Sequence, residues 1–448
     1  GWREERVSIL FGTVPDEEFE KATKACREVI NFYQSRINDH PGNVKYVLRK
    51  GRGLVLLTNI HSAAENHDEA MKSAGERIDL MESLPQAERD EHRKIIRDSH
   101  RTRMEVADTA GRIFREECSA DVVQRAEQGI YPSELWTVLV DNGLVLAGID
   151  EANGGSGGIL VDALVILREA ARRAVPLPLA ETFVASQLMN QLQQPIPSLP
   201  VTLVQGHFEL TEQGRLTGQC LGVPFARHCQ SFLIVVGDSV KGGQQNDRLC
   251  LVDADQVTLE YDRNISGEPC DALTTEIEVA QQRIFAVDRA FLDHGRLLGA
   301  AARAVMMAGA LEEMLKITVD YALERRQFGK AIAKFQAIQQ QLAVFAGEVA
   351  ASVRAADTLL DRAELNPLDV AIAKARIGEA SGLSAEIAHQ VHGAIGYTRE
   401  HRLNQLSRRL WLWRDQFGNE HEWHETVAKA FLNDPGMGLW QKITELKV

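Results

Sequence analysis

The segment Tyr321-Ala-Leu-Glu-Arg-Arg-Gln-Phe-Gly-Lys-Ala-Ile332, followed closely by Phe335-Gln-Ala-Ile338, interrupts the longest helical pattern in the chain. Upstream of it, from Arg289 onward, apolar residues recur at three- and four-residue steps, which is the period of a helix with one buried face. Two arginines near the end of such a helix complement its dipole, and Gly329 is expected to cap it. These effects account for the arginines but leave the Gln-Phe-Gly and Phe-Gln pairs unexplained.

Three more long helices are expected downstream of this break. Their apolar residues keep the helical period, and their richness in Ala and Leu is typical of helices that pack as an antiparallel bundle. We predict them over residues 335–365, over residues 367–391, and from residue 402 to beyond residue 431.

The chain before residue 289 changes character twice. Five prolines crowd between Pro176 and Pro200, where they would interrupt a regular helix or strand, so we place a domain junction there. After the junction, short β-rich runs separated by Gly, Asp and Asn predict a small antiparallel sheet. Before the junction, helices are predicted over residues 101–118, 132–142 and 160–173.

The resulting fold class is mainly α with a central β domain. The predicted boundaries are an N-terminal extension of unknown role over residues 1–95, an N-terminal helical domain over 96–195, a β domain over 196–288 and a C-terminal helical bundle over 289–448. In the extension, residues 54–60 fit either a buried strand or the start of a helix, and their pattern does not decide between the two.

The amino-acid composition disfavours several classes of function. The chain has 448 residues with 50 Lys and Arg against 63 Asp and Glu, and a formal net charge of −13 disfavours binding to nucleic acid or to an anionic membrane. No apolar run is long enough to span a bilayer, and the six cysteines form no Cys-x-x-Cys pair and no metal-finger spacing. We therefore expect a cytoplasmic protein with reduced thiols and without a metal site.

Two local patterns resemble ligand sites but favour simpler interpretations. The glycine-rich segment Gly154–Gly158 follows no strand and lacks a Lys-Ser/Thr pair, so we interpret it as a turn between helices rather than a phosphate loop. His421 and His424 are three residues apart on a predicted helix, but they do not form His-Glu-x-x-His and have no third ligand nearby. We expect them on a solvated helix face.

A second motif, Gln390-Val-His-Gly-Ala-Ile-Gly-Tyr397, lies farther along the chain. Together, Arg325-Arg-Gln-Phe-Gly329 and this motif closely resemble the Arg-x-Gln-Phe-Gly and Gln-x-x-Gly-Gly-x-Gly-aromatic signatures of the acyl-CoA dehydrogenase flavoproteins. Pro132-Ser-Glu-Leu-Trp136 and Gly154-Gly-Ser-Gly-Gly158 are also similar to that family's N-terminal domain. The resemblance extends from residue 96 to the C-terminal helices and leaves residues 1–95 outside it.

The resemblance implies a fold and a cofactor. The expected fold is an N-terminal helical domain, a small β-barrel-like domain and a C-terminal four-helix bundle. FAD would lie between the β domain and the bundle, with its adenine end reaching a neighbouring subunit. By matched position, Arg325 would contact the FAD pyrophosphate, and Gln327, Phe328 and Gln336 would line the adenosine region.

The second motif would meet the diphosphate from the other side. The resemblance assigns this contact to Gln390 and to the backbone of Gly393 to Gly396, where small residues permit a close approach. Ala394 replaces the second glycine of the family pattern, which would narrow that approach.

The catalytic base expected from the family is missing. In one branch a Glu directly precedes a Gly in the segment after the Gly-Tyr motif, and here that position is Phe417. In another branch a Glu precedes the Arg of the first C-terminal helix, and here that position is Gly295. The nearby carboxylates, which are the remaining candidates for a base, are Asp415, Asp293 and Glu420.

The β domain departs from the family as well, because residues 201–206 do not match its Thr-Glu-Pro and Gly-Ser-Asp element. The leading hypothesis is an FAD-dependent acyl-CoA dehydrogenase, or a subunit of one, that desaturates an acyl-CoA thioester. Motif loss on the flavin-ring side is similar to one subunit of the heteromeric acyl-CoA dehydrogenases of steroid side-chain degradation. The expected assembly is a homo- or heterotetramer, and in the heteromeric case its second subunit is also acyl-CoA dehydrogenase-like. Two alternatives stay open: a non-catalytic subunit that supports FAD and assembly, and a flavin-dependent monooxygenase or oxidase.

Overall fold

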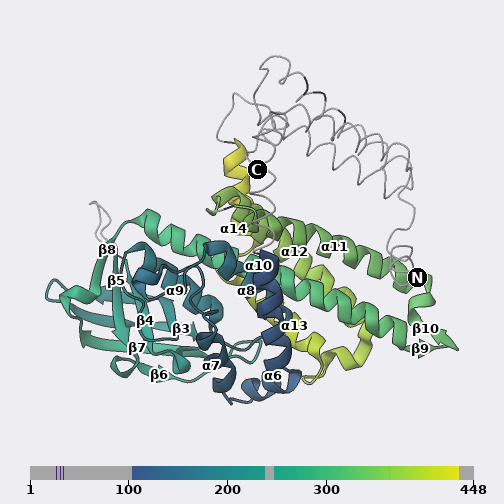
Figure 1. Cartoon of the computed structure of the whole chain (residues 1–448), viewed down its shortest axis with the longest axis horizontal. Coiled ribbons are helices and arrows are strands. Elements are labelled where there is room, and N and C mark those ends of the chain that lie inside the picture. Colours follow the sequence, from purple (N-terminus) through teal and green to yellow (C-terminus); the bar gives the residue numbers. More distant parts are fainter. Residues whose placement is uncertain are drawn as a thin grey trace. The chain divides into compact units, whose positions relative to one another are not determined.

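The computed structural model describes residues 103–237, 247–362 and 364–432, together with the single helical positions 27, 31 and 34 (Figure 1). Almost all of the expected N-terminal extension therefore lies outside the described residues. By its contacts the chain divides into two units: Glu105–Pro435 forms one of them, and the other joins Gly1–Met104 to Gly436–Val448. Everything that follows concerns the first unit.

The unit begins with helices. Residues 103–117 are helical. The next helix begins after Ser119, whose side chain accepts a hydrogen bond from the backbone N–H of Val122 at 3.4 Å, as an N-cap does. The helix inside the proline-rich stretch was not expected from the sequence; it starts directly after Pro178, the residue at its N-cap. The helices are α6 (Ala120–Glu127), α7 (Ser133–Asp141), α8 (Leu160–Arg172) and α9 (Leu179–Gln191).

The β domain contains two four-stranded sheets rather than one small antiparallel sheet. In the first, β1 (Val201–Gln205) runs parallel to β4 (Ser231–Val236), which pairs with β5 (Asp247–Asp253) and then β8 (Ile284–Val287). In the second, the order is β2 (His207–Leu210), β3 (Arg215–Pro224), β7 (Cys270–Glu278) and β6 (Thr258–Glu260), all antiparallel.

Strand β4 explains why the two sheets pack together. Its continuous apolar run leaves Phe232 and Ile234 buried in one cluster, which also contains Leu216 of β3 and Leu273 of β7. Leu233, the residue between them, is buried in the larger cluster that includes the helices. A strand that is apolar on both faces needs a partner layer on each side, and β4 has both.

The C-terminal helices are α10 (Arg289–Glu324), α11 (Gln336–Leu360), α12 (Pro367–His392), α13 (Arg402–Asp415) and α14 (Glu420–Leu432). Helix α10 packs against α8, α11, α12 and α13, and small residues such as Ala301 and Ala304, both fully buried, allow that close approach. The single helix expected from Arg402 onward is wrong: it breaks after Asp415, because Phe417 and Gly418 adopt φ values of +58° and +101°. None of the described helices is both long enough and apolar enough to cross a bilayer.

Candidate functional site: a split anion-binding surface

The motif Arg325–Gly329 forms a hairpin at the end of α10. Helix α10 stops at Glu324, and its C-cap is Arg325, whose backbone N–H donates to the Tyr321 carbonyl at 2.8 Å. Strands β9 (Arg326–Gln327) and β10 (Lys330–Ala331) then pair antiparallel. Phe328 and Gly329 between them have φ values of +51° and +80°, which suits a two-residue turn with both central residues left-handed. Gly329 therefore turns the hairpin instead of capping the helix.

The side chains of this hairpin face away from the chain's own core. Arg325, Gln327 and Gln336 are exposed, and Phe328 is 93% exposed. Within the described residues no carboxylate pairs with the Arg325 guanidinium, so its donors are available to an outside group. A large exposed ring beside an unpaired cation is typical of a surface that a ligand or another subunit covers.

The second motif forms the turn after α12. Gly393 ends the helix with φ +66° and ψ −146°, a conformation that side chains disfavour, and a Cβ added there would meet nothing within 4 Å. Gln390, Gly393 and Ala394 are exposed. Gly396 is different: a Cβ there would lie 2.9 Å from Leu403 and 3.0 Å from His392. Gly396 is thus required by the close packing of the chain around it, whereas the space beside Gly393 is open.

An aromatic stack joins the two motifs. The Tyr321 ring, one helical turn before Arg325, stacks on the His392 ring with centroids 4.4 Å apart. The Tyr321 hydroxyl also donates to the His392 carbonyl at 3.3 Å. The end of α10 and the end of α12 are therefore held together, and the structure places the two sequence-predicted halves of the site on neighbouring helix ends.

Buried histidines lie behind this surface. His389 and His392 are only 3% and 4% exposed, and burial lowers the pKa of both imidazoles below its ordinary value. His392 Nδ1 lies 2.9 Å from the Ala388 carbonyl, and His389 Nε2 lies 2.8 Å from the Ser407 hydroxyl. The remaining ring nitrogen of each has no partner. Both imidazole rings are therefore uncharged near neutral pH and bring no positive charge to the surface in front of them.

The junction between α13 and α14 holds Phe417. Its ring occupies the space above Gly299 of α10, where an added Cβ would lie 2.3 Å from a ring carbon. The turn is tied down from two sides, because Lys374 Nζ donates to the Arg414 and Gly418 carbonyls at 2.7 and 2.8 Å, and Trp423 Nε1 donates to the Phe417 carbonyl at 3.2 Å. Burial lowers the pKa of Lys374 to about 8.

A buried ion pair lies one helical turn from this junction. Arg303 of α10 pairs with Glu181 of α9, and both residues are more than nine-tenths buried. The Arg303 guanidinium also lies 5.8 Å from the Trp413 ring centroid. The interior between α9, α10 and α13 is therefore occupied by a paired charge and aromatic rings.

The comparisons with known proteins agree with this architecture. Residues 285–429 match the family model "Acyl-CoA dehydrogenase, C-terminal domain", and residues 100–194 match "Acyl-CoA dehydrogenase, N-terminal domain". The chain belongs to the acyl-CoA dehydrogenase family. Its relatives include acyl-CoA dehydrogenase IpdE2 of Mycobacterium tuberculosis, which is 27% identical over 286 residues covering 62% of this chain and 80% of that protein.

Solved structures of this acyl-CoA dehydrogenase fold are also similar. The ChsE4–ChsE5 complex from Mycobacterium tuberculosis contains a chain with a TM-score of 0.65 and 20% identity, covering 75% of this chain and 98% of that one. A variant of the Tcur3481–Tcur3483 steroid ACAD gives a TM-score of 0.64 and 23% identity, covering 74% and 98%. These likenesses establish the fold, with its N-terminal helices, central β sheets and C-terminal helices.

Neither position that carries the base in acyl-CoA dehydrogenases has a carboxylate here. Gly295 is buried, and a Cβ there would lie 3.1 Å from Leu188. Of the substitute candidates, Asp293 is exposed and pairs with Arg289 at 3.1 Å, and Asp415 is exposed. Glu420 is mostly buried but forms an ion pair with Arg414. Asp415 and Glu420 both lie near enough to act electrostatically on Lys374.

The residues of the split surface fit the FAD diphosphate that the family implies. A diphosphate needs donors that no internal anion has taken, together with a backbone that it can approach closely, and Arg325 and the Gly393 turn offer these. On the flavin-ring side the fit is lost, because residues 201–205 form the mostly buried strand β1 rather than a polar loop. The residues present therefore fit the diphosphate part of the group that the family implies and do not fit its flavin ring.

The structure describes both segments for which the sequence favoured a simpler interpretation than a ligand site. The Gly154–Gly158 segment is a loop closed by an isolated bridge between Ile149 and Gly157. His421 and His424 pair with Glu425 and Glu379 at 3.3 and 3.5 Å. Across the described ranges, no group of three His, Cys, Asp or Glu side chains could hold a metal ion.

Sequence reasoning missed a buried ionic network between three parts of the chain. Arg409, fully buried on α13, donates through Nε to Glu268 at 2.8 Å and through Nη1 to Glu127 at 3.2 Å. Arg408 Nη2 donates to the other Glu127 oxygen at 2.6 Å. The adjacent arginine pair on a predicted helix was the only signal for this network in the sequence.

Substitution of Gly299 by Ala is expected to destabilise the protein. The Phe417 ring must shift to admit a Cβ, at a cost of about 1–3 kcal/mol that exceeds the gain in helix propensity of about 1 kcal/mol. Urea unfolding should show a lower midpoint. Gly347→Ala on α11, where a Cβ meets nothing within 4 Å, is the matched control and should raise the midpoint. A rise for both variants would show that Phe417 does not rest on Gly299.

The stability of the protein should fall as the pH is lowered through 6.5. Burial lowers the pKa of His389, His392 and His401 in the folded state below the ordinary value of 6.5. Below pH 6.5 the unfolded chain therefore binds protons that the folded chain does not, so acid favours unfolding. The free energy of unfolding, measured from pH 7.5 to 5.5, should decrease, and His392→Gln should make that decrease smaller. An unchanged slope in this variant would contradict the assignment.

Proposed function

We propose that this chain is the FAD-supporting subunit of a heteromeric acyl-CoA dehydrogenase whose other subunit supplies the catalytic base. The observation that carries the proposal is Phe417, which rests on Gly299 where the family's carboxylate would stand. A phenyl ring cannot accept a proton, and the Lys374 and Trp423 hydrogen bonds hold the turn in place. A carboxylate from elsewhere in this chain would have to displace a packed interior.

The retained half of the site supports a role in cofactor binding. When bound, FAD supplies the hydride acceptor for α,β-desaturation of an acyl-CoA thioester. In this proposal Arg325 donates to the diphosphate, Gln390 and the Gly393 turn approach it from the other side, and Gln327, Phe328 and Gln336 border the adenosine. The Tyr321–His392 stack holds the Arg325 hairpin and the Gly393 turn next to each other.

The exposure of this surface favours completion by a second subunit. Phe328 is 93% exposed, and Ile395 and Tyr397 of the second motif are 47% and 64% exposed. Such rings and apolar side chains are ordinarily covered in an assembly. The similarity to the ChsE4–ChsE5 and Tcur3481–Tcur3483 proteins supports an unlike partner in a tetramer, and steroid side-chain acyl-CoA as the substrate class. A cytoplasmic location remains part of this proposal.

The test is to purify the chain alone and together with an acyl-CoA dehydrogenase-like chain encoded beside it. We expect little FAD with the single chain and a stable complex that binds FAD in a fixed ratio. Steroid side-chain and straight-chain acyl-CoA thioesters should then be compared as reductants of the complex. A homotetramer of this chain with full FAD and dehydrogenase activity would refute the proposal.

A further inference from the structure

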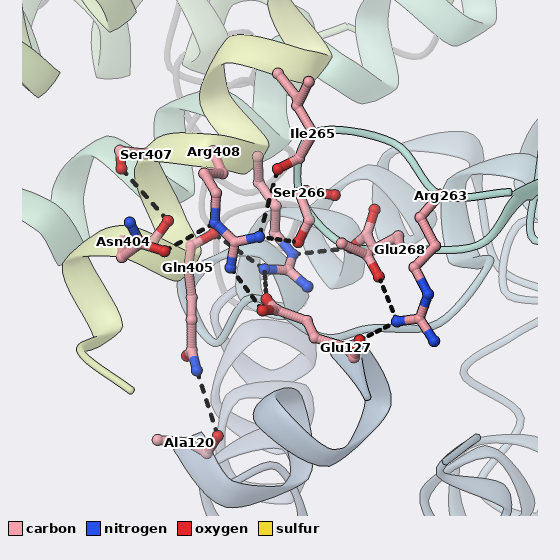
Figure 2. Close-up of polar contacts among 12 residues, drawn as sticks. Ala120, Glu127, Arg263, Ile265, Ser266, Glu268, Asn404, Gln405, Ser407 and Arg408 are labelled. Atoms are coloured by element: carbon pink, nitrogen blue, oxygen red, sulfur yellow. Dashed lines mark hydrogen bonds and ion pairs between the residues drawn. The ribbon is translucent and has the colours of Figure 1, made fainter. Parts of the chain in front are cut away.

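A cleft of about 500 Å³, with no residue of the Arg325 hairpin in its lining, opens on the surface. It lies where the end of α6, the loop between β6 and β7, and the segment from the Gly-Tyr motif into α13 meet. Its walls include Arg263, Arg399, Arg408, Gln128 and Ile265. Figure 2 shows Arg408 and Arg263 on either side of Glu127, with Ile265 above them. Three guanidinium groups thus converge on one opening.

The carboxylate in the lining of this cleft, Glu127, and the neighbouring Glu268 are already engaged. One Glu127 oxygen accepts from Arg408 and the other from Arg409, while Glu268 accepts from Arg409. Arg409 still has one buried nitrogen, Nη2, without a partner. Four arginines therefore stand against two glutamates, which leaves a local surplus of positive charge in a chain whose net charge is −13.

Two of the arginines retain donors for a ligand. The Arg263 guanidinium bonds only to the neutral carbonyls of Glu127 and Gly267. The side chain of Arg399 has no hydrogen bond or ion pair with any residue that the structure describes. A planar guanidinium presents paired donors that match phosphate oxygens, so Arg263 and Arg399 suit a phosphorylated ligand.

The size and lining of the cleft narrow the ligand class. A volume of about 500 Å³ is within the range of small-molecule and cofactor sites, which is about 300–1,000 Å³. Ile265 is 59% exposed and offers an apolar wall, and the exposed Gln128 amide can both donate and accept. We propose that this cleft binds a nucleoside diphosphate, with Arg263 and Arg399 on the phosphates and Ile265 against the base.

The lining of this cleft shares no residue with the proposed FAD contacts. It includes neither the β9–β10 hairpin nor residues 390–396, although Arg399 follows the second motif two residues after Tyr397. The proposal does not depend on the chain's proposed role in FAD binding. The two can therefore be tested by independent substitutions.

The experiment is calorimetric titration of the full chain, with its partner where the two co-purify, at a saturating FAD concentration that occupies the Arg325 surface, using ADP, pyrophosphate and inorganic phosphate as probes. We expect saturable binding of ADP at one site per chain, weaker at higher salt. Arg399→Gln should weaken ADP binding by about tenfold or more, because the charge-assisted hydrogen bonds from Arg399 to the phosphates are lost. The substitution should not disturb the fold. Arg263→Gln should weaken ADP binding as well. Pyrophosphate should bind less tightly than ADP, and phosphate least.

Two variants serve as controls. Arg289→Gln, at an exposed ion pair on α10, should leave ADP binding unchanged. Arg325→Gln should also leave it unchanged, which separates this cleft from the FAD surface. Absence of saturable ADP binding by the wild-type chain would overturn the proposal. So would equal affinity in Arg399→Gln, or loss of binding in Arg325→Gln, because the ligand would then occupy another site.

Discussion

Arg325→Gln is expected to weaken FAD binding to the assembled complex by about 100-fold, through loss of two charge-assisted hydrogen bonds to the diphosphate. The guanidinium is exposed and pairs with no carboxylate of the described chain, so the substitution leaves no buried charge unpaired and should not alter the fold. The dissociation constant can be measured by flavin fluorescence on the deflavinated complex.

The neighbouring arginine provides the matched control for this prediction. Arg326 has the same charge and exposure and lies one residue farther, in β9. Arg326→Gln should change the dissociation constant by no more than a few-fold, which would attribute the effect to the position of Arg325 rather than to net charge. Equal FAD affinity in the wild type and in Arg325→Gln would show that this surface does not hold the diphosphate.

Arg409→Met should lower the free energy of unfolding by about 3–5 kcal/mol, because it leaves the buried Glu268 carboxylate without its ion-pair partner and Glu127 with Arg408 alone. The Arg409 side chain is fully buried, and it lies between α6, the loop before β7, and α13. Its loss therefore removes a contact between the N-terminal helices, the β domain and the C-terminal helices. Urea denaturation of the full chain measures the effect.

Two comparisons make the Arg409 prediction specific. Arg215→Met removes the exposed Arg215–Glu276 pair and should change stability by about 0–1 kcal/mol. Adding Glu268→Gln to Arg409→Met should recover part of the loss, since an uncharged amide is less costly to bury than a carboxylate. If Arg409→Met were no more harmful than Arg215→Met, the network would not join these parts of the fold.

The order of helical, β and helical regions could be predicted from sequence because each region has its own period. The long α10 pattern and the Gln-Phe-Gly motif are local, and both appear where they were expected. Helix α9 was missed because the prolines around it suggested a junction, although proline is well tolerated just before a helix. The break between α13 and α14 was missed because Phe417 takes a left-handed conformation that is unusual for its residue type.

The buried charges could not have been predicted in the same way. Arg409 and Glu127 are 282 residues apart, and Arg303 and Glu181 are 122 residues apart. An ion pair across such a separation depends on tertiary packing, which no local pattern encodes. The sequence already showed that residues 295 and 417 are not carboxylates. The structure shows what occupies these positions instead: a buried glycine packed against Leu188, and a phenyl ring over Gly299.

In the proposed complex this chain holds FAD while another subunit supplies the base. This division of roles is tested by the anaerobic rate at which an acyl-CoA bleaches the flavin of the assembled complex, compared among Asp293→Asn, Asp415→Asn, Glu420→Gln and the wild type. We predict that all three variants keep the wild-type rate. Loss of bleaching in any one that retains its FAD would contradict the account, because that carboxylate would then be the base.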